Sequence, residues 1–310
     1  MMKMSLNNAS HFLSQATLGA NFTEIKRASE LGVHDWLGEQ FAKRSKSYFD
    51  HTNDIWAFYK SKFIQKHGRR KLEQDYFNPC IPYWFYWRMA WWDLTMKGED
   101  QLRQRVAQAL SQIIVVSEQS ELELSAFGLA SFFDVLHRNA FGNFRDILLE
   151  TTLHPAMGVY LSHLFNRKGD PKANRRPDEN YAREIMQLFS IGLFELNEDG
   201  SRKKDSAGND IPTYDNADIQ RLAKVFTGLE LAGYYWPWDN YSSTLPVKWD
   251  PSYEYNQSKA SANLWDPMKM NERYHDKSEK RILKRTTLKA EQSGMKDIEQ
   301  AIDVLFNHPN

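Results

Sequence analysis

Apolar residues recur at helical spacing along most of the first 230 residues, which predicts a mainly helical fold. The clearest pattern covers residues 100–118, where one apolar stripe is expected to face the core. This stripe consists of Leu102, Val106, Ala109, Leu110, Ile113 and Val116. Two short helices are predicted within residues 22–41, on either side of Gly32, because glycine disfavours a helix interior.

Glycine and proline predict further helix boundaries. Residues 129–165 predict a helix, a break at Gly142, a second helix, and a third helix after the turn at His154-Pro155. The remaining helices are expected within residues 8–19, 216–231 and 295–309.

Residues 82–94, PYWFYWRMAWWDL, are apolar around almost the whole helical circumference. Trp84, Trp87 and Trp91 are spaced so that they could form a platform for stacking sugars. A helix that is apolar on all sides is usually buried, however. We therefore expect this helix to lie in the core.

Two segments depart from the helical pattern. Residues 195–214 carry turn signals at Asp199-Gly200 and Gly208-Asn209, which predict a small β-hairpin or meander. The acidic residues in it lack the EF-hand spacing and do not indicate a calcium loop. Residues 231–270 show no sustained period and predict a long, irregular, aromatic-rich insert.

Composition limits the classes of function. The chain has 310 residues, and we predict one large helical domain spanning residues 1–310. Lys and Arg total 40, as do Asp and Glu, so net charge gives no reason to expect a nucleic acid or an anionic membrane as partner. Cys80 is the only cysteine, which excludes an internal disulfide. No transmembrane segment is predicted, and the first residues lack a signal-peptide pattern.

Several familiar catalytic motifs are missing. The sequence has no phosphate-binding G-x-x-x-x-G-K-[ST] loop, no G-x-S-x-G nucleophile elbow and no H-E-x-x-H zinc motif. These absences argue against P-loop nucleotide hydrolysis, α/β-hydrolase chemistry and the common zinc proteases.

Residues 178–192, DENYAREIMQLFSIG, predict an amphipathic helix with two open interpretations. Its apolar side carries Tyr181, Ile185, Leu188 and Phe189, and its polar side carries Glu179, Asn180, Arg183, Glu184 and Gln187. The polar side is either wet surface, with an ion pair worth about 0.3–0.5 kcal/mol, or the lining of a polar cavity.

Histidines near acidic residues are the other candidates for chemistry. His154 and His163 belong to one predicted helical region, and His275-Asp276 precedes Lys280. A site for Zn, Mn or Fe would need such histidines to converge with Glu184 or another acid. Each histidine is alternatively explained by a capping or core-edge hydrogen bond.

Long blocks of the sequence resemble the bacterial family called domain of unknown function 1800. The blocks are LRQRVAQALSQIIVVSE, HRNAFGNFRDILLETTLHPAMGVYLSHLFN, PDENYAREIMQLFSIGLFELNEDG, IPTYDNADIQRLAKVFTGLE and YHDKSEKRIL, and they occur in this order. Leu229 stands where the family pattern usually has Trp, and family members continue beyond HPN, so we expect the chain to be part of a longer one.

The resemblance implies no established activity. It implies export to the periplasm or beyond, and a sulfatase-like protein as a candidate partner. It also marks polar positions that recur in the family, namely His154, Asn180, Arg183, Glu184, Thr227, His275, Asp276 and Lys280.

The leading hypothesis is a hydrolase acting on an anionic or sugar-containing extracellular substrate, with a divalent metal as a candidate cofactor. Arg183 would hold an oxyanion, Glu184 or His275 would act as base, and Asp276 would orient His275 or help to hold the metal. The predicted substrate-binding residues are Asn180, Thr227, Lys280 and His154.

Two alternatives stay open. In the first, the protein binds a partner without catalysis, through an exposed patch of Trp236, Trp238, Tyr241 and Trp249. In the second, the polar positions form an internal hydrogen-bond network that fixes helix packing.

Overall fold

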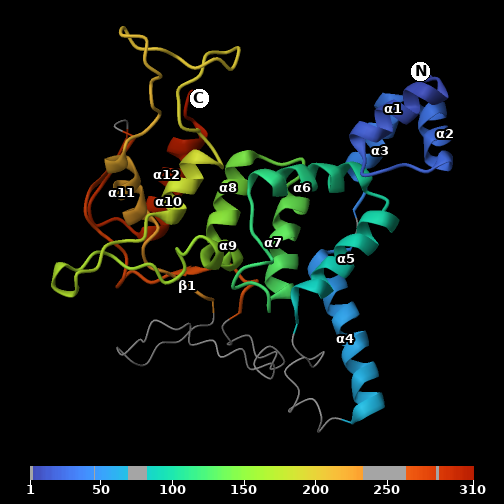
Figure 1. Cartoon of the computed structure of the whole chain (residues 1–310), viewed down its shortest axis with the longest axis horizontal. Helices are drawn as coiled ribbons and strands as arrows, with labels where there is room; N and C mark the ends of the chain where they lie inside the picture. The colour runs from blue at the N-terminus through green and yellow to red at the C-terminus, as the bar shows by residue number, and fades with distance from the viewer. Residues whose placement is uncertain (1–2, 45, 69–81, 233–262, 284–285) are drawn as a thin grey trace. The chain divides into compact units, whose positions relative to one another are not determined.

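The computed structural model describes residues 3–44, 46–68, 82–232, 263–283 and 286–310. The chain divides into two compact units, Met1–Asn143 and Phe144–Asn310. Both units are mainly helical, which confirms the predicted fold class (Figure 1). That all 310 residues act as one domain stays a prediction. Most of the predicted aromatic insert, with its four named aromatic residues, lies outside the described residues.

The helices of the first unit match most of the predicted segments. They are α1 (Leu6–Ala16), α2 (Phe22–Leu31), α3 (Val33–Ala42), α4 (Tyr48–His67), α5 (Trp84–Lys97), α6 (Gln101–Ile113) and α7 (Ala126–Arg138). Gly32 separates α2 from α3 with a φ of 82°, a conformation that glycine adopts without steric cost.

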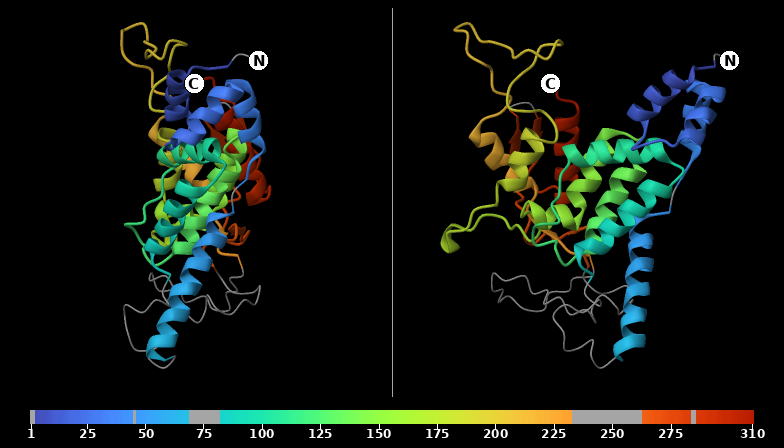
Figure 2. Two further views of the ribbon diagram at one scale, coloured as in Figure 1. Left: turned by 90° about the vertical axis from the view of Figure 1, so that its right-hand side faces the viewer. Right: turned by 45° about the vertical axis from the view of Figure 1, so that its right-hand side comes forward.

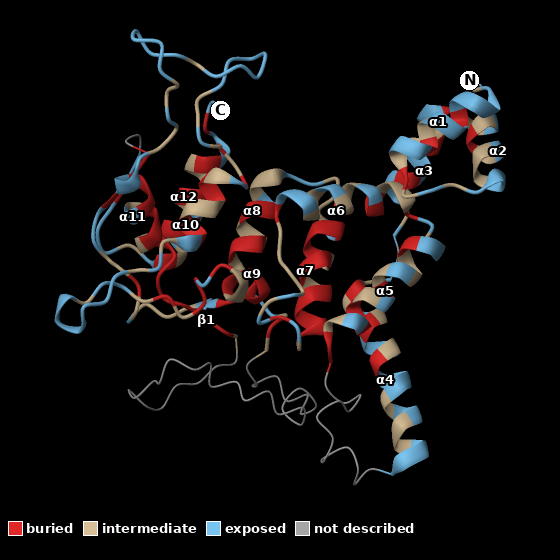
Figure 3. Ribbon diagram, in the orientation of Figure 1, coloured by how far each residue is buried: buried red, intermediate tan, exposed pale blue. Residues whose placement is uncertain are grey.

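Helices α4, α5 and α7 pack through aromatic side chains. The rings of Tyr48 and Phe133 meet edge to face with centroids 4.8 Å apart, and those of Trp56 and Phe127 do so at 5.5 Å. Trp87 of α5 also contacts Phe133. Helix α7 is buried along most of its length (Figure 3). It is therefore the central element of this core.

The prediction that the apolar stripe of α6 faces the core is wrong. The buried residues of this helix are Arg103, Gln104 and Ala107, whereas Ile113 is 47% exposed. The cause is Asp100, which is fully buried and accepts hydrogen bonds from His137 at 2.8 Å and Gln104 at 2.9 Å. A buried carboxylate needs polar partners, so it draws the polar side of α6 inwards.

The expectation that α5 lies in the core holds for only part of its surface. Trp87 is buried, but Trp92 is 55% exposed and Met96 is 76% exposed. Helix α5 packs on α4 and α7, and these two neighbours cover only one side of it. The predicted three-tryptophan stacking platform has no support, because Trp87 belongs to the core.

In its described residues, the second unit combines five α-helices and one 3-10 helix with two small antiparallel sheets. Its elements are α8 (Phe144–Leu153), α9 (Pro155–Tyr160), the 3-10 helix η2 (Pro171–Ala173), α10 (Asn180–Gln187), α11 (Asn216–Val225), β1 (Leu229–Glu230), β2 (Lys269–Met270), β3 (Lys280–Ile282), β4 (Thr286–Leu288) and α12 (Gly294–Phe306). Helix α11 packs against α10, α12 and β3, and therefore occupies the centre.

The first β-pair joins segments that are far apart in sequence, and the second joins two neighbouring strands. Leu229 pairs with Met270, so the two flanks of the predicted insert meet. In the second sheet, Lys280 pairs with Leu288 and Ile282 with Thr286. No helix in the described part of the chain is long and apolar enough to cross a membrane.

The predicted hairpin near residues 195–214 is confirmed as a short antiparallel meander. Its bridges join Phe194 to Pro212, Leu196 to Arg202 and Lys204 to Asp210. Both predicted turns are present, and Gly200 and Gly208 have φ values of 80° and 85°.

Replacing Asp100 with alanine should destabilise the first unit. The change leaves the buried donors of His137 and Gln104 without an acceptor, which costs about 3 kcal/mol. Urea unfolding followed by circular dichroism measures the loss. Glu121→Ala, at an exposed position, is the control and should change stability by less than about 0.5 kcal/mol. Equal stabilities of the two variants would contradict the role given to Asp100.

Candidate functional site

Helix α10 places one apolar face against the core of the second unit. Tyr181, Ala182, Ile185 and Met186 are buried, and the Tyr181 hydroxyl lies 2.7 Å from Thr152 Oγ1. Leu188, predicted to share this face, is 54% exposed, because the helix ends at Gln187 and the chain turns. The remaining residues of the helix form a polar face.

The polar face of α10 is accessible. Arg183 Nη2 lies 3.7 Å from Glu179 Oε2, and the Arg183 side chain is 43% exposed. Asn180 begins the helix, where its backbone N–H donates to Asp178 Oδ1 at 2.8 Å. Such an exposed ion pair contributes little to stability, so Arg183 is not part of an internal network.

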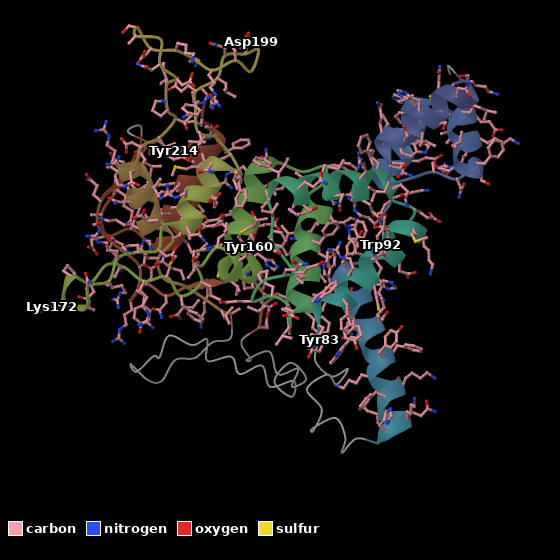
Figure 4. All side chains as sticks on the ribbon, viewed as in Figure 1. Tyr83, Trp92, Tyr160, Lys172, Asp199 and Tyr214 are labelled. Atoms are coloured by element: carbon pink, nitrogen blue, oxygen red, sulfur yellow. The ribbon has the colours of Figure 1, made fainter. Side chains whose placement is uncertain are left out.

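Glu184 and Tyr214 each carry a polar atom whose hydrogen-bonding capacity is unused. Glu184 Oε2 and the Tyr214 hydroxyl are buried from solvent and have no hydrogen-bond partner in the described structure. Burial raises the pKa of Tyr214, and the nearby Glu184 raises it further while Arg183 opposes the shift. The Tyr214 hydroxyl is therefore under the electrostatic influence of both side chains. Figure 4 labels Tyr214, which directly precedes the cap of α11.

Helix α11, which packs on α10, adds a second guanidinium. Arg221 Nη2 lies 2.6 Å from Asp218 Oδ1 and 4.0 Å from Asp215 Oδ1. Its Nε atom is buried and also lacks a hydrogen-bond partner in the described structure. We call Arg183, Glu184 and Tyr214 the α10–α11 polar cluster, and Arg221 lies on the helix that packs against α10. Other buried polar atoms of the described residues also lack a partner, among them Thr52 Oγ1, Gln104 Oε1 and His163 Nδ1, so an unpaired atom marks a candidate position and is not by itself a site.

A second polar group lies in the interior around Asp297, on α12. His275 Nε2 lies 3.0 Å from Asp297 Oδ2, and Lys280 Nζ donates to the same oxygen at 2.7 Å. Gln292 donates to the other carboxylate oxygen. All three of His275, Lys280 and Asp297 are at most 1% exposed. Sequence reasoning missed Asp297, because its helical neighbours give no sign that an acid lies inside.

The hydrogen-bonding capacity of the buried group is fully used. His275 Nδ1 lies 2.8 Å from the backbone oxygen of Thr227, so both ring nitrogens face acceptors inside the protein. Burial alone would raise the pKa of Asp297, but hydrogen bonds from His275, Lys280 and Gln292 outweigh burial and lower it. The group therefore resembles a structural ion network rather than an accessible reaction centre.

Thr227 and Asp276 are hydrogen-bonded to each other beside the buried group. Thr227 Oγ1 accepts a hydrogen bond from the Asp276 N–H at 2.9 Å, and Asp276 Oδ1 accepts one from Ser278 N–H at 2.9 Å. The carboxylate that is hydrogen-bonded to the His275 ring is Asp297, which therefore occupies the orienting position predicted for Asp276.

Gly228 has a φ of 92°, and a Cβ there would lie 2.8 Å from the Asn271 oxygen, so the chain needs glycine at this crossing.

The other two candidate histidines make local hydrogen bonds. His154 caps α9, since its Nδ1 accepts from the Ala156 N–H at 3.1 Å. His163 Nε2 lies 2.9 Å from the Thr152 oxygen, and its ring stacks on Tyr181 with centroids 3.9 Å apart. Complete burial lowers the pKa of His163 to about 4. Both match the alternative of capping or core-edge hydrogen bonds.

The predicted site residues therefore fall into separate places. Thr227, His275, Asp276 and Lys280 come together around Asp297, whereas Arg183 and Glu184 lie in the α10–α11 polar cluster with Tyr214, which sequence reasoning missed. Asn180 begins α10, one turn before Arg183 and Glu184, whereas His154 caps α9 in another place. No group of three His, Cys, Asp or Glu side chains that could hold a metal ion occurs within the described ranges.

A family model described as "Protein of unknown function (DUF1800)" matches residues 11–310 and confirms the resemblance. No curated protein and no solved structure matches the chain.

Replacing Asp297 with asparagine should destabilise the second unit by about 3–5 kcal/mol, because the Lys280 charge stays buried without a counterion. Since the pKa of Asp297 is lowered in the folded protein, its contribution is present at neutral pH and is lost as pH falls below about 4. Urea titrations at pH 7 and pH 3 measure both effects.

Asp303→Asn is the matched control for Asp297→Asn. Asp303 lies on the same helix and pairs with Arg145 at 2.6 Å, but its side chain is 47% exposed. Such a surface pair is worth less than about 1 kcal/mol. A comparable loss in both variants would contradict a special role for the buried carboxylate.

His163 should make the stability depend on pH between about 6.5 and 4. In this pH range His163 is protonated in the unfolded chain but not in the folded protein, so stability falls as pH falls. Between pH 7.5 and pH 5 the natural protein should lose about 2 kcal/mol more than His163→Phe in urea titrations. His11→Gln, at an exposed position, should retain the full pH dependence. Parallel pH profiles for the natural protein and His163→Phe would refute this assignment.

Proposed function

The chain belongs to the DUF1800 family, and we propose that this member is a hydrolase whose reacting groups lie in the α10–α11 polar cluster. The observation that carries the proposal is the buried Glu184 oxygen, which has no hydrogen-bond partner among the described residues. A carboxylate that only supports packing is normally paired. Glu184 Oε2 is closed to solvent in this structure, and its unused lone pairs would accept a proton from a molecule that reaches it from the polar face of α10.

Each member of the cluster has a role in this proposal. Glu184 is the general base that takes a proton from the attacking water. The half-exposed Arg183 guanidinium stabilises the negative charge that develops on the attacked group. Tyr214 donates a hydrogen bond from its hydroxyl, which like that of any tyrosine is protonated at neutral pH.

The charges of the cluster and of Arg221 support an anionic or sugar-containing substrate. Guanidinium groups bind carboxylate, sulfate or phosphate oxygens, and Arg183 and Arg221 supply two of them. Carboxylate oxygens and the Asn180 amide suit the hydroxyl groups of a sugar. Action outside the cytoplasm rests on the family resemblance and stays a prediction.

His275 has no contact with substrate in this proposal. The ring is fully buried, and both of its nitrogens are occupied by Asp297 and Thr227. Glu184 is therefore preferred as the base. Lys280 and Asp276 hold the polypeptide around His275 and do not react.

The alternative is a binding protein that acts with a partner and performs no chemistry. The same unpaired atoms would then hold a ligand or a partner side chain. The family resemblance names a sulfatase-like protein as candidate, and the aromatic patch proposed for it, Trp236 to Trp249, lies outside the described residues.

Glu184→Gln tests the enzyme directly. The assay panel consists of p-nitrophenyl acetate, sulfate and phosphate and of p-nitrophenyl glycosides. We expect the natural protein to hydrolyse at least one of them, and the variant to lose about 100-fold or more in kcat, because a general base contributes that much. Thermal unfolding should change little, since Glu184 has no hydrogen-bond partner in the described structure to lose.

Glu179→Gln is the matched control on the same helix. It removes the exposed ion pair to Arg183 and should keep kcat within a few-fold of the natural value. Hydrolysis that survives in Glu184→Gln would overturn the assignment of the base. No hydrolysis at all, together with ligand binding that Glu184→Gln abolishes, would favour the binding alternative.

A further inference from the structure

The second half of α4 has an unusual surface. The buried residues of this helix, Tyr48, Thr52 and Trp56, all lie in its first half. From residue 57 to residue 67 every position is exposed or half-buried. Figure 2 shows these last turns extending past α5, on which the first half packs. Core packing therefore does not explain the residue types found there.

One face of this segment combines aromatic and cationic side chains. Tyr59, Lys62, Phe63, Lys66 and His67 line a shallow hollow on the surface. They are spaced at i, i+3, i+4, i+7 and i+8, which places all five on the same side of an α-helix. We call this set the α4 basic face. Its linear arrangement is fixed by the helix and needs no other element to form.

The charge of the α4 basic face is not balanced locally. Residues 55–68 contain no Asp or Glu, whereas the first half of the helix carries Asp50 and Asp54. No ion pair joins Lys62 or Lys66 to a carboxylate of the described residues. Like charges at i and i+4 weaken a helix by a few tenths of a kcal/mol. Helix stability therefore does not explain why Lys62 and Lys66 stand at these positions.

Exposed aromatic side chains lie on and beside the α4 basic face. Tyr59, on the basic face, is 44% exposed, and Phe58, next to this face, is 55% exposed. Lys62 lies over the Phe58 ring, with Nζ 5.7 Å from the centroid. On a membrane surface, aromatic rings can enter the interfacial layer while the long stems of neighbouring lysines lie along it and keep their ammonium groups at the lipid headgroups.

We propose that the α4 basic face docks the protein on an anionic phospholipid surface. The helix lies flat on the membrane, Tyr59 and Phe63 enter the interfacial layer, and Lys62 and Lys66 bind lipid phosphates. A straight, one-sided helix face fits a planar surface better than the grooved backbone of a nucleic acid. The proposal concerns the first unit and is independent of the proposed hydrolase.

Vesicle co-sedimentation of the full chain tests this proposal. Vesicles of phosphatidylcholine are compared with vesicles of phosphatidylcholine and phosphatidylglycerol at 3:1, at low and physiological salt. We expect binding to the anionic vesicles only, weakened by salt. Lys62→Gln/Lys66→Gln should reduce the partition coefficient about 25-fold, from about fivefold per lysine. Glutamine is a good helix former, so the helix is retained.

Two further variants separate the contributions. Lys172→Gln/Lys296→Gln removes the same charge at exposed positions elsewhere and should bind like the natural protein. Phe63→Ala should weaken binding even at high salt, since it removes apolar insertion. Failure to bind anionic vesicles, or equal binding by the two lysine variants, would overturn the proposal. Binding of a single-stranded oligonucleotide without binding of vesicles would assign the face to nucleic acid instead.

Discussion

A charge buried away from water must be neutralised by partners that the fold supplies, and the second unit is organised around one such charge. Asp297 receives hydrogen bonds from His275, Lys280 and Gln292, which lie in the segment of chain that leads into α12. Its helix, α12, packs on α11, and α11 packs on α10. The position of the polar face of α10 therefore depends on this buried ion network.

The first unit also contains a buried carboxylate that is held by hydrogen bonds. Asp100 is buried between α6 and α7 and is satisfied by His137 and Gln104. In both units a buried carboxylate with hydrogen-bond partners joins elements of the fold. Buried atoms without a partner occur in both units as well, Gln104 Oε1 and Glu184 Oε2 among them, so Glu184 is set apart by its place on a half-exposed helix face beside Arg183.

Net charge conceals how the charges are distributed. The chain has 40 basic and 40 acidic residues, which argued against an anionic partner. The structure places Lys62 and Lys66 on a helix surface without a carboxylate nearby in the described residues, so a local field exists in a neutral protein. Electrostatic recognition depends on this local field within a Debye length of about 10 Å.

The sequence alone determined the helical class, the breaks at Gly32 and Pro155, the meander and the family, because these depend on local periodicity, turn chemistry and long sequence blocks. It identified Glu184 and Arg183 as candidates but not Tyr214 or Asp297. Only tertiary structure decided which polar residues are buried and paired. The hydrophobic pattern of α6 pointed to the wrong face, since a distant partner, His137, sets the environment of Asp100. Such pairings join residues far apart in sequence, where no local pattern records them.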